Sequence, residues 1–411
     1  MALKLQTFLH LFVLSILLCT SSSDHSLAKA LVAPPINALV AQITKAAETS
    51  LYTLSLSHKD YLLDLSGPLL WSPCSAGNPT VPCSAAECTA TLGTHRYFAQ
   101  GQCRCTARLK NPVTGDRAVV GDLTLVDVVT NATDGSTPTA EVTVGGVLSA
   151  CAPAGFLGSS PLPAAVAGDA GLGRGCASLP AQLHSKLSLK RQFAVCLPST
   201  VGRIGVAFFG DGPYGLMPPT PFDVSSVLSY TPLVRNPWNP SAYTIQLAGI
   251  AINQEAVQLP PGALDLVTLD TAAPYTVLRH DVYRAFVAAF QRATASVPRV
   301  PAVAPFEVCF NISDLGFSGV GYAVAPVDLV MARGGGNWTV FGFNSLAEVA
   351  DDTACLAFVD GGWAAPSAVT VGGFQMENNF LVFDEAASRL GYSGALLLTR
   401  TACGNFNFAR N

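Results

Sequence analysis

The sequence YLLDLSGPLLW occupies residues 61–71 and combines an apolar run, an aspartate, a short turn and a second apolar run. Residues 265–278, DLVTLDTAAPYTVL, repeat this arrangement around a second aspartate. The two aspartates, Asp64 and Asp270, are 206 residues apart, close to half the length of the chain. In a further pair of similar stretches, 165–173 and 368–374, an apolar run leads into glycines, once in each half. Repeats of this kind indicate two homologous lobes that face each other.

The composition favours a β-rich extracellular protein. Of the 411 residues, 50% are hydrophobic and only 12% are charged, and Ser, Thr, Asn and Gly supply most of the polarity. Gly (36) and Pro (28) are frequent but not periodic, which excludes a collagen-like or disordered chain. The formal net charge is -4, and Lys and Arg form no cluster. A protein that binds the nucleic-acid backbone is therefore excluded, because it needs a basic face.

Short strands with turns between them account for most of the chain. The alternating pattern predicts a hairpin of strands 50–57 and 61–65 with its turn at residues 58–60, and further strands at 122–130 and 140–147. Helical signals are few: a helix at 178–187 capped by Ser178, and a helix at 282–293 capped by Asp281. The chain is therefore expected to be mainly β, with several short helices on the outside.

The N-terminus indicates secretion. Lys4 precedes the apolar stretch 8–19, and small polar residues follow, as in a signal peptide cleaved between residues 21 and 28. A membrane anchor is the alternative, but this stretch is shorter than the ~20 apolar residues that a span needs. Three glycosylation sequons begin at Asn131, Asn311 and Asn337. The Pro-rich stretch 213–221 predicts the domain boundary, with a signal peptide at 1–28, an N-terminal lobe at 29–215 and a C-terminal lobe at 216–411.

The cysteines indicate disulfides rather than a metal site. Of the 12 cysteines, Cys19 lies in the signal peptide, and the other 11 are expected to be mostly paired in an oxidising compartment. The odd number leaves one thiol, for which Cys176 is the candidate because a Gly-rich turn precedes it. Cys103 and Cys105 are too close in sequence for the usual pair of zinc ligands. We therefore expect no metal and no cofactor.

Several stretches resemble the pepsin-like aspartic proteases, particularly their plant branch. They cover nearly the whole mature chain and include residues 171–175 with 178–183, 371–375, 379–384 and 388–392. Other stretches are most similar to the non-proteolytic relatives in this branch, namely the xylanase inhibitors of cereal type, related extracellular glycoproteins and seed globulins; they include residues 69–74, 278–284, 304–309 and 353–358. The resemblance implies a bilobal pepsin-like fold with two homologous β-barrel-like lobes.

The resemblance assigns Asp64 and Asp270 to the catalytic pair, but their neighbours differ from those of active enzymes. Aspartic proteolysis needs two carboxylates that share a proton around a bound water, and in active enzymes each is followed by Thr or Ser and then Gly. Here Asp64 is followed by Leu65 and Ser66, and Asp270 by Thr271 and Ala272. The region that corresponds to the flap, residues 111–118, contains no Tyr. We therefore expect an inactive pair.

The resemblance also implies contacts with a xylanase. In the cereal inhibitors a C-terminal His and a Leu of the C-lobe enter the xylanase cleft; these positions fall at Thr399, next to Arg400, and near Val320 in a loop that also carries Phe317. An uncharged Thr cannot pair with a carboxylate as His⁺ can, whereas Arg400 can. We further expect disulfides Cys309–Cys355 within the C-lobe and Cys196–Cys403 between the C-terminus and the N-lobe.

The sequence thus predicts a secreted, proteolytically inactive protein that inhibits microbial endo-xylanases in plant defence. It is expected to act as a monomer in the extracellular space or cell wall, and to bind neither nucleic acid nor, once mature, a membrane. Two alternatives stay open. Because both aspartates are retained, the chain can be an active secreted aspartic endopeptidase; or it can be an extracellular storage or binding glycoprotein.

Overall fold

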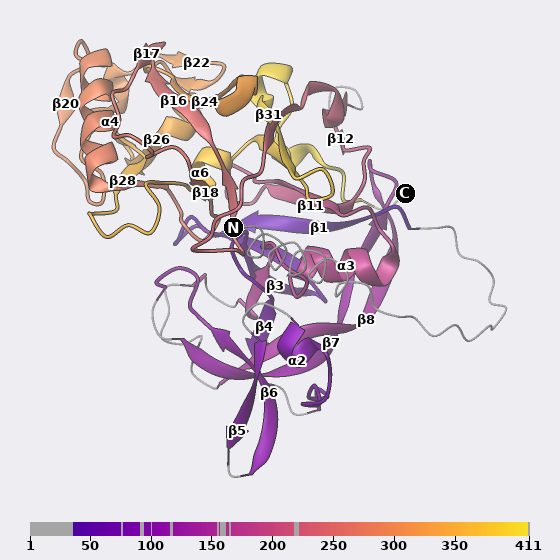
Figure 1. The fold of residues 1–411 in the computed structure, drawn as a ribbon. Coiled ribbons are helices and arrows are strands. Elements are labelled where there is room, and N and C mark those ends of the chain that lie inside the picture. The colour runs from indigo at the N-terminus through magenta and orange to yellow at the C-terminus, as the bar shows by residue number, and fades with distance from the viewer. Residues whose placement is uncertain are drawn as a thin grey trace, which may run out of the picture.

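The structure is a computed structural model that describes residues 36–409, apart from 75–76, 91–93, 100, 116–117, 154–155, 157–161, 164–165 and 218–221. The predicted signal peptide, residues 1–28, lies outside the described residues. Figure 1 shows the N-terminal half in indigo to magenta and the C-terminal half in orange to yellow, with β1 (Ala38–Lys45) and β11 (Ile204–Gly210) lying between them. Strands dominate and the helices are short, so the prediction of a mainly β chain is confirmed.

One sheet of 14 strands runs through the N-terminal half and takes up three strands from the C-terminal half. In spatial order its strands are β14 (Ser229–Pro232), β31 (Arg389–Ala395), β30 (Asn379–Asp384), β10 (Gln192–Cys196), β11, β1, β2 (Tyr52–Leu56), β3 (Lys59–Asp64), β9 (Asp169–Gly171), β4 (Leu70–Pro73), β8 (Pro138–Ala152), β7 (Val119–Thr133), β6 (Gln102–Leu109) and β5 (Thr94–Ala99). The β5–β6 hairpin projects from the bottom of the molecule in Figure 1.

Smaller sheets make up most of the C-terminal half. The five-stranded sheet consists of β15 (Tyr243–Ile245), β18 (Val267–Leu269), β29 (Val369–Val371), β19 (Thr276–Leu278) and β28 (Phe358–Asp360). Two four-stranded sheets consist of β17 (Glu255–Ala256), β16 (Leu247–Ile252), β24 (Val327–Met331) and β25 (Asn337–Val340), and of β20 (Arg299–Val300), β21 (Cys309–Asn311), β27 (Thr353–Leu356) and β26 (Leu346–Ala350). A two-stranded sheet consists of β22 (Phe317–Ser318) and β23 (Gly321–Tyr322). The pair β12 (Gly215–Leu216) and β13 (Phe222–Asp223) precedes them.

The helices are short, and α6 is buried along its whole length. The α-helices are α2 (Glu87–Ala90), α3 (Leu179–Leu187), α4 (His280–Ala293), α5 (Gly342–Ser345) and α6 (Gly373–Met376). The 3-10 helices are η2 (Val224–Val227), η3 (Ile312–Asp314), η4 (Ala332–Gly334), η5 (Leu396–Thr399) and η6 (Cys403–Asn405). The longest, α4, lies on the outer side of the C-terminal half in Figure 1. The described residues contain no helix long and apolar enough to cross a membrane.

Two local predictions are corrected by the structure. The β2–β3 turn consists of Ser57 and His58, both with positive φ, rather than residues 58–60, because a two-residue turn of this kind matches the twist of the paired strands. Helix α4 has Arg279 at its N-cap, so the prediction that Asp281 caps it is wrong. Asp281 lies in the first turn instead, where its carboxylate pairs with Arg279 and accepts a hydrogen bond from the Val282 N–H.

The two halves share strands, core and an ion pair. Strand β10 pairs with β30 over five residues, and across this seam the ring of Phe193 stacks on that of Phe383 with centroids 4.7 Å apart. In the same seam Lys45 Nζ lies 2.6 Å from Glu377 Oε1, and the Tyr52 hydroxyl donates to the same oxygen at 2.5 Å. The predicted boundary between residues 215 and 216 falls inside the short strand β12 and stays a prediction.

Candidate functional site

Both predicted aspartates line one cleft of about 450 Å³. Asp64 is the last residue of β3, and Asp270 directly follows β18. In each half, therefore, an aspartate lies at the C-terminal end of a strand. Asp64 is 5% exposed, and Asp270 is partly buried. The cleft is thus built where the two repeated stretches of the sequence meet.

Backbone N–H groups hold the two carboxylates in the same way. The Ser66 N–H donates to Asp64 Oδ1 at 2.7 Å, and the Ala272 N–H donates to Asp270 Oδ1 at 2.9 Å. Each donor lies two residues after its aspartate, which is an Asx-type turn. A Cβ at Gly67 would lie 2.8 Å from Asp64 Oδ2 and 2.7 Å from Gly171 Cα, so this close approach requires glycine.

A single threonine connects the two turns. The Thr271 hydroxyl accepts the Leu65 N–H at 3.1 Å and donates to the Leu63 carbonyl at 2.5 Å. Leu65 occupies the equivalent position in the other half, is fully buried and has no hydroxyl. The N-terminal turn is therefore tied to the C-terminal one, but no reciprocal side-chain bond is available from residue 65.

A third carboxyl, which sequence analysis missed, also lines the cleft. Asp169 lies on β9 opposite Trp71 of β4. It is 2% exposed, and its Oδ1 has no hydrogen-bond partner in the part of the chain that the structure describes. The available signal was a carboxyl inside an otherwise apolar and Gly-rich run, residues 165–173.

The three carboxyls hold their protons more tightly than free aspartate does. Burial raises the pKa of Asp64 to about 6, although the N–H groups of Ser66 and Gly67 partly offset this. Burial and the charge of Asp64 raise the pKa of Asp270 to about 7. Burial and, after it, Asp64 raise the pKa of Asp169 well above its usual range. Burial and mutual repulsion thus disfavour the doubly charged pair, which is the direction expected for two carboxyls that share a proton.

The predicted flap borders the same cleft. Lys110, Asn111, Pro112 and Gly115, between β6 and β7, line it, and the turn is closed by the Asn111 side chain, which accepts the Val113 N–H at 2.9 Å. Residues 116–117 of the predicted flap lie outside the described residues. Sequence analysis also missed Trp238, which lines the cleft with 86% of its surface exposed.

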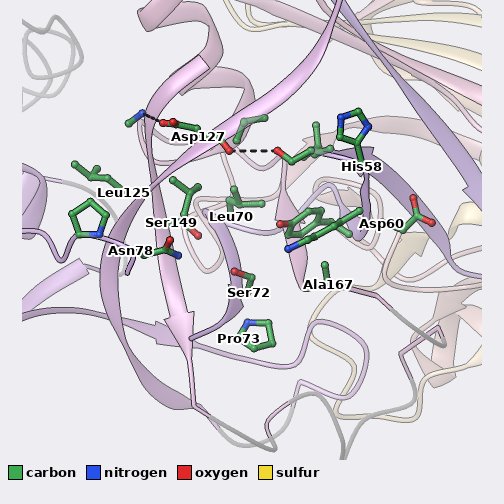
Figure 2. Close-up of a pocket in the computed structure, with 18 residues that line it drawn as sticks. His58, Asp60, Leu70, Ser72, Pro73, Asn78, Leu125, Asp127, Ser149 and Ala167 are labelled. Atoms are coloured by element: carbon green, nitrogen blue, oxygen red, sulfur yellow. Dashed lines mark hydrogen bonds between the residues drawn. The ribbon is translucent and has the colours of Figure 1, made fainter. Parts of the chain in front are cut away.

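A second, larger cavity lies on the other face of β4. Leu69 and Trp71 line the cleft with the aspartates, whereas Leu70 and Ser72 line a cavity of about 1020 Å³ in the N-terminal half. This alternation follows from the two faces of a strand. Figure 2 shows the side chains of this cavity, including Asp127, whose Oδ1 accepts the Gly146 N–H and whose carbonyl accepts the Ser57 hydroxyl.

The residues predicted to contact a partner lie on the surface of the C-terminal half. Phe317 is 67% exposed, and its ring contacts those of Tyr322 and Phe343. Val320 is half-buried, and its carbonyl accepts the Phe343 N–H. Thr399 and Arg400 are exposed at the end of η5, where Arg400 has a positive φ of 58°.

Phe343 connects these two segments. Besides its contact with Phe317, it lines a groove of about 290 Å³ together with Leu397, which lies in η5 just before Thr399. The next residue, Leu398, is 62% exposed. We call Phe317, Val320, Phe343, Leu398, Thr399 and Arg400 the aromatic–arginine surface. Sequence analysis missed Phe343 and Leu398, because both read as core residues in apolar runs.

The three sequons occupy different settings. Asn337 is exposed on β25. Asn311 is partly exposed at the start of η3, where its Oδ1 accepts the N–H and the hydroxyl of Ser313. Asn131 is partly exposed within β7.

Five disulfides join cysteines that both lie among the described residues, and they include both predicted pairs, Cys196–Cys403 and Cys309–Cys355. The others are Cys74–Cys151, Cys83–Cys103 and Cys88–Cys105. Cys176 is disulfide-bonded as well, so the prediction that it carries the free thiol is wrong. No group of three metal-ligating side chains occurs within the described ranges.

Comparisons with known proteins agree with this architecture. Residues 55–211 match the family model described as xylanase inhibitor N-terminal, and residues 242–394 match the one described as xylanase inhibitor C-terminal. A rice (Oryza sativa subsp. japonica) protein named chitinase CLP is 46% identical over 90% of this chain and 91% of its own. The crystal structure of edgp superposes with a TM-score of 0.85 at 32% identity, covering 92% of this chain and 100% of that one.

The relationship to active enzymes is distant and concerns the fold. The aspartic proteinase of Irpex lacteus superposes with a TM-score of 0.55 at 13% identity, over 88% of this chain and 99% of that one. This confirms the pepsin-like bilobal fold that the sequence predicted. The two family models, which together cover most of the described residues, show that the chain belongs to the xylanase inhibitor (TAXi) family of aspartic-protease-like proteins.

Proposed function

We propose that the mature chain is a secreted inhibitor of microbial endo-xylanases that acts in plant defence and does not cleave peptides. The observation that carries this proposal is the aromatic–arginine surface on a chain of the xylanase inhibitor family. Secretion rests on the signal-peptide pattern of residues 1–28, and the sequons at Asn131, Asn311 and Asn337 agree with it.

The chemistry of the surface suits the cleft of a glycoside hydrolase. Such a cleft holds two carboxyl groups on either side of the scissile bond. Arg400 offers a permanent positive charge with donors arranged to match a carboxylate. Phe317 and Leu398 add exposed apolar area, and aromatic residues and arginine are the types that dominate binding energy at protein interfaces. The surface therefore offers both exposed apolar area and a cationic group that suits a carboxylate.

We expect the purified chain to slow the release of reducing sugar by microbial endo-xylanases. Arg400→Ala and Phe317→Ala should each weaken inhibition at least about tenfold, because each removes a central contact. Matched controls are Arg333→Ala and Phe98→Ala, which remove an exposed arginine and an exposed phenylalanine elsewhere. Their inhibition should equal that of the unchanged chain.

Two results would count against the proposal. The first is a lack of inhibition across a panel of endo-xylanases. The second is equal inhibition by Arg400→Ala, Phe317→Ala and the controls, which would show that the xylanase contacts a different part of the chain. Because a 46% identical relative is named a chitinase, the chain alone is also incubated with chitin oligomers; their hydrolysis would assign the chain an enzymatic rather than an inhibitory role.

A second candidate function is aspartic endopeptidase activity. It is favoured by one observation: the cleft keeps both aspartates, and Thr271 still ties their turns together. Against it stand Leu65, which has no hydroxyl to return the bond that Thr271 makes, and Ser66 and Ala272, which occupy the positions of glycine in active enzymes. If neither activity is found, an extracellular storage or binding role remains.

A further inference from the structure

The groove of about 290 Å³ that Phe343 lines connects the aromatic–arginine surface with the N-terminal half of the chain. The turn between β10 and β11 contributes Ser199 and Arg203 to its lining, and the C-terminal segment contributes Leu397 and Ala402. We call it the Arg203 groove. Because Phe343 belongs to both, the groove continues the aromatic–arginine surface onto a segment of the other half.

Asn378 holds the two sides of the groove together. Its Nδ2 donates to Ser199 Oγ at 2.9 Å, and its Oδ1 accepts the Cys403 N–H at 3.1 Å. Its carbonyl accepts the Leu396 N–H at 2.9 Å, at the start of η5. Asn378 is buried and has a φ of 51°, a conformation that asparagine adopts more readily than most residues. The groove is therefore formed before any partner binds, and a preformed site loses less conformational freedom on binding.

Arg203 is a cation without an acidic partner in the part of the chain that the structure describes. Its stem lies on the C-terminal segment, since a Cβ at Gly404 would lie 3.3 Å from Arg203 Cβ and 3.7 Å from its Cγ and Cδ. The side chain is exposed, and among the described residues it forms no ion pair. The described lining of the groove includes no aspartate or glutamate. The groove is thus positive, although the chain as a whole has a formal net charge of -4.

We propose that the Arg203 groove takes a carboxylate-bearing loop of the endo-xylanase that is bound at the aromatic–arginine surface. This inference rests on the proposed function and extends its contact to the N-terminal half. The Arg203 guanidinium pairs with the carboxylate, because its donors match the two oxygens, while Leu397 and Ala402 contact the apolar part of the loop.

The extent of a stable interface supports this contact. Such an interface buries about 800 Å² on each partner, which is more than a few side chains provide. An enzyme seated on Phe317, Phe343 and Arg400 therefore has to cover neighbouring surface as well. The groove adjoins Phe343 directly and has the charge that attracts a carboxylate.

The test measures inhibition constants of the full mature chain and its variants against an endo-xylanase that the unchanged chain inhibits. Arg203→Ala should weaken inhibition at least about fivefold, and Arg203→Glu should weaken it further because it repels the carboxylate. Arg333→Ala removes an exposed arginine elsewhere and should inhibit as the unchanged chain does. The effect of Arg203→Ala should shrink between about 0.05 M and about 0.5 M salt, because salt screens exposed charges.

A second variant tests whether the groove itself is occupied. Ala402→Phe places a ring in the groove and should weaken inhibition at least about tenfold, because the loop no longer fits. Its control is Ala364→Phe, which adds the same ring at an exposed alanine between β28 and β29 and should change nothing. Urea unfolding of all variants separates a lost contact from a lost fold.

The outcomes distinguish this inference from the function on which it rests. A mature chain that inhibits no endo-xylanase would overturn both. Inhibition that Arg400→Ala and Phe317→Ala weaken, but that Arg203→Ala leaves unchanged, would overturn this inference alone. So would full inhibition by a folded Ala402→Phe variant, since the groove would then be empty in the complex.

Discussion

Removal of the Cys196–Cys403 disulfide is expected to lower the free energy of unfolding by about 5 kcal/mol. The bond closes a loop with a sequence separation of 207, so in the unfolded chain its loss restores far more conformational freedom than the loss of a short bridge would. Both cysteines are fully buried, in a cluster with Phe208, Phe380 and Phe406. Stability of the joined lobes should therefore depend on this bond more than on any local one.

The measurement is urea unfolding of the Cys196→Ala/Cys403→Ala double variant. Its control is Cys83→Ala/Cys103→Ala, which opens a bridge with a separation of only 20 and should lose about 3 kcal/mol. Since η6 holds Cys403 and follows Arg400, the first variant should also lose xylanase inhibition before it unfolds completely. Equal losses of stability in the two double variants would refute the loop-length argument.

The free energy of unfolding is expected to fall by a few kcal/mol between about pH 5 and about pH 8. Burial raises the pKa of Asp64 to about 6 and that of Asp270 to about 7, and it raises the pKa of Asp169 well above its usual range. In the unfolded chain these groups lose their protons near pH 4. Between these values the folded protein holds protons that the unfolded chain does not, so a rise in pH favours unfolding.

Each carboxyl that is protonated only in the folded state contributes a slope of about 1.4 kcal/mol per pH unit. Urea unfolding at several pH values should therefore give a shallower slope for Asp169→Asn, by up to that amount, than for the unchanged chain. Asp351→Asn replaces an exposed carboxyl and should leave the slope as it was. A stability that is constant or rises from about pH 5 to about pH 8 would be incompatible with buried protonated acids.

Much of the fold could be predicted because it is repeated. The stretches around Asp64 and Asp270 have the same order of apolar run, acid and turn, and repetition at half the chain length leaves few arrangements other than two facing lobes. Strands β7 and β8 and helices α3 and α4 were predicted for the same kind of reason: their periodicity is local. The wrong predictions concern a helix end and a turn, where a single residue determines the boundary. They are the N-cap of α4, which is Arg279, and the turn formed by Ser57 and His58.

The site could be predicted only in part. The repeat in the sequence marks Asp64 and Asp270. Asp169 has no counterpart in the other half, and its position beside Trp71 follows from the pairing of β9 with β4. Leu398 and Phe343 look like core residues in sequence, and their exposure depends on how η5 and α5 dock on the rest of the C-terminal half. A sequence pattern indicates which face of an element is apolar. It does not indicate which apolar residues stay exposed once the elements have packed together.

We propose that Asp64 and Asp270 keep their positions in the cleft but do not cleave peptides. The most direct test is peptide release from casein and haemoglobin by the purified mature chain between about pH 2 and about pH 7, with Asp270→Asn measured beside it. Because Leu65 has no hydroxyl and cannot complete the bond that Thr271 makes, the two proteins should give the same background at every pH. Cleavage with an acid optimum that Asp270→Asn abolishes would show a working peptidase and contradict the account.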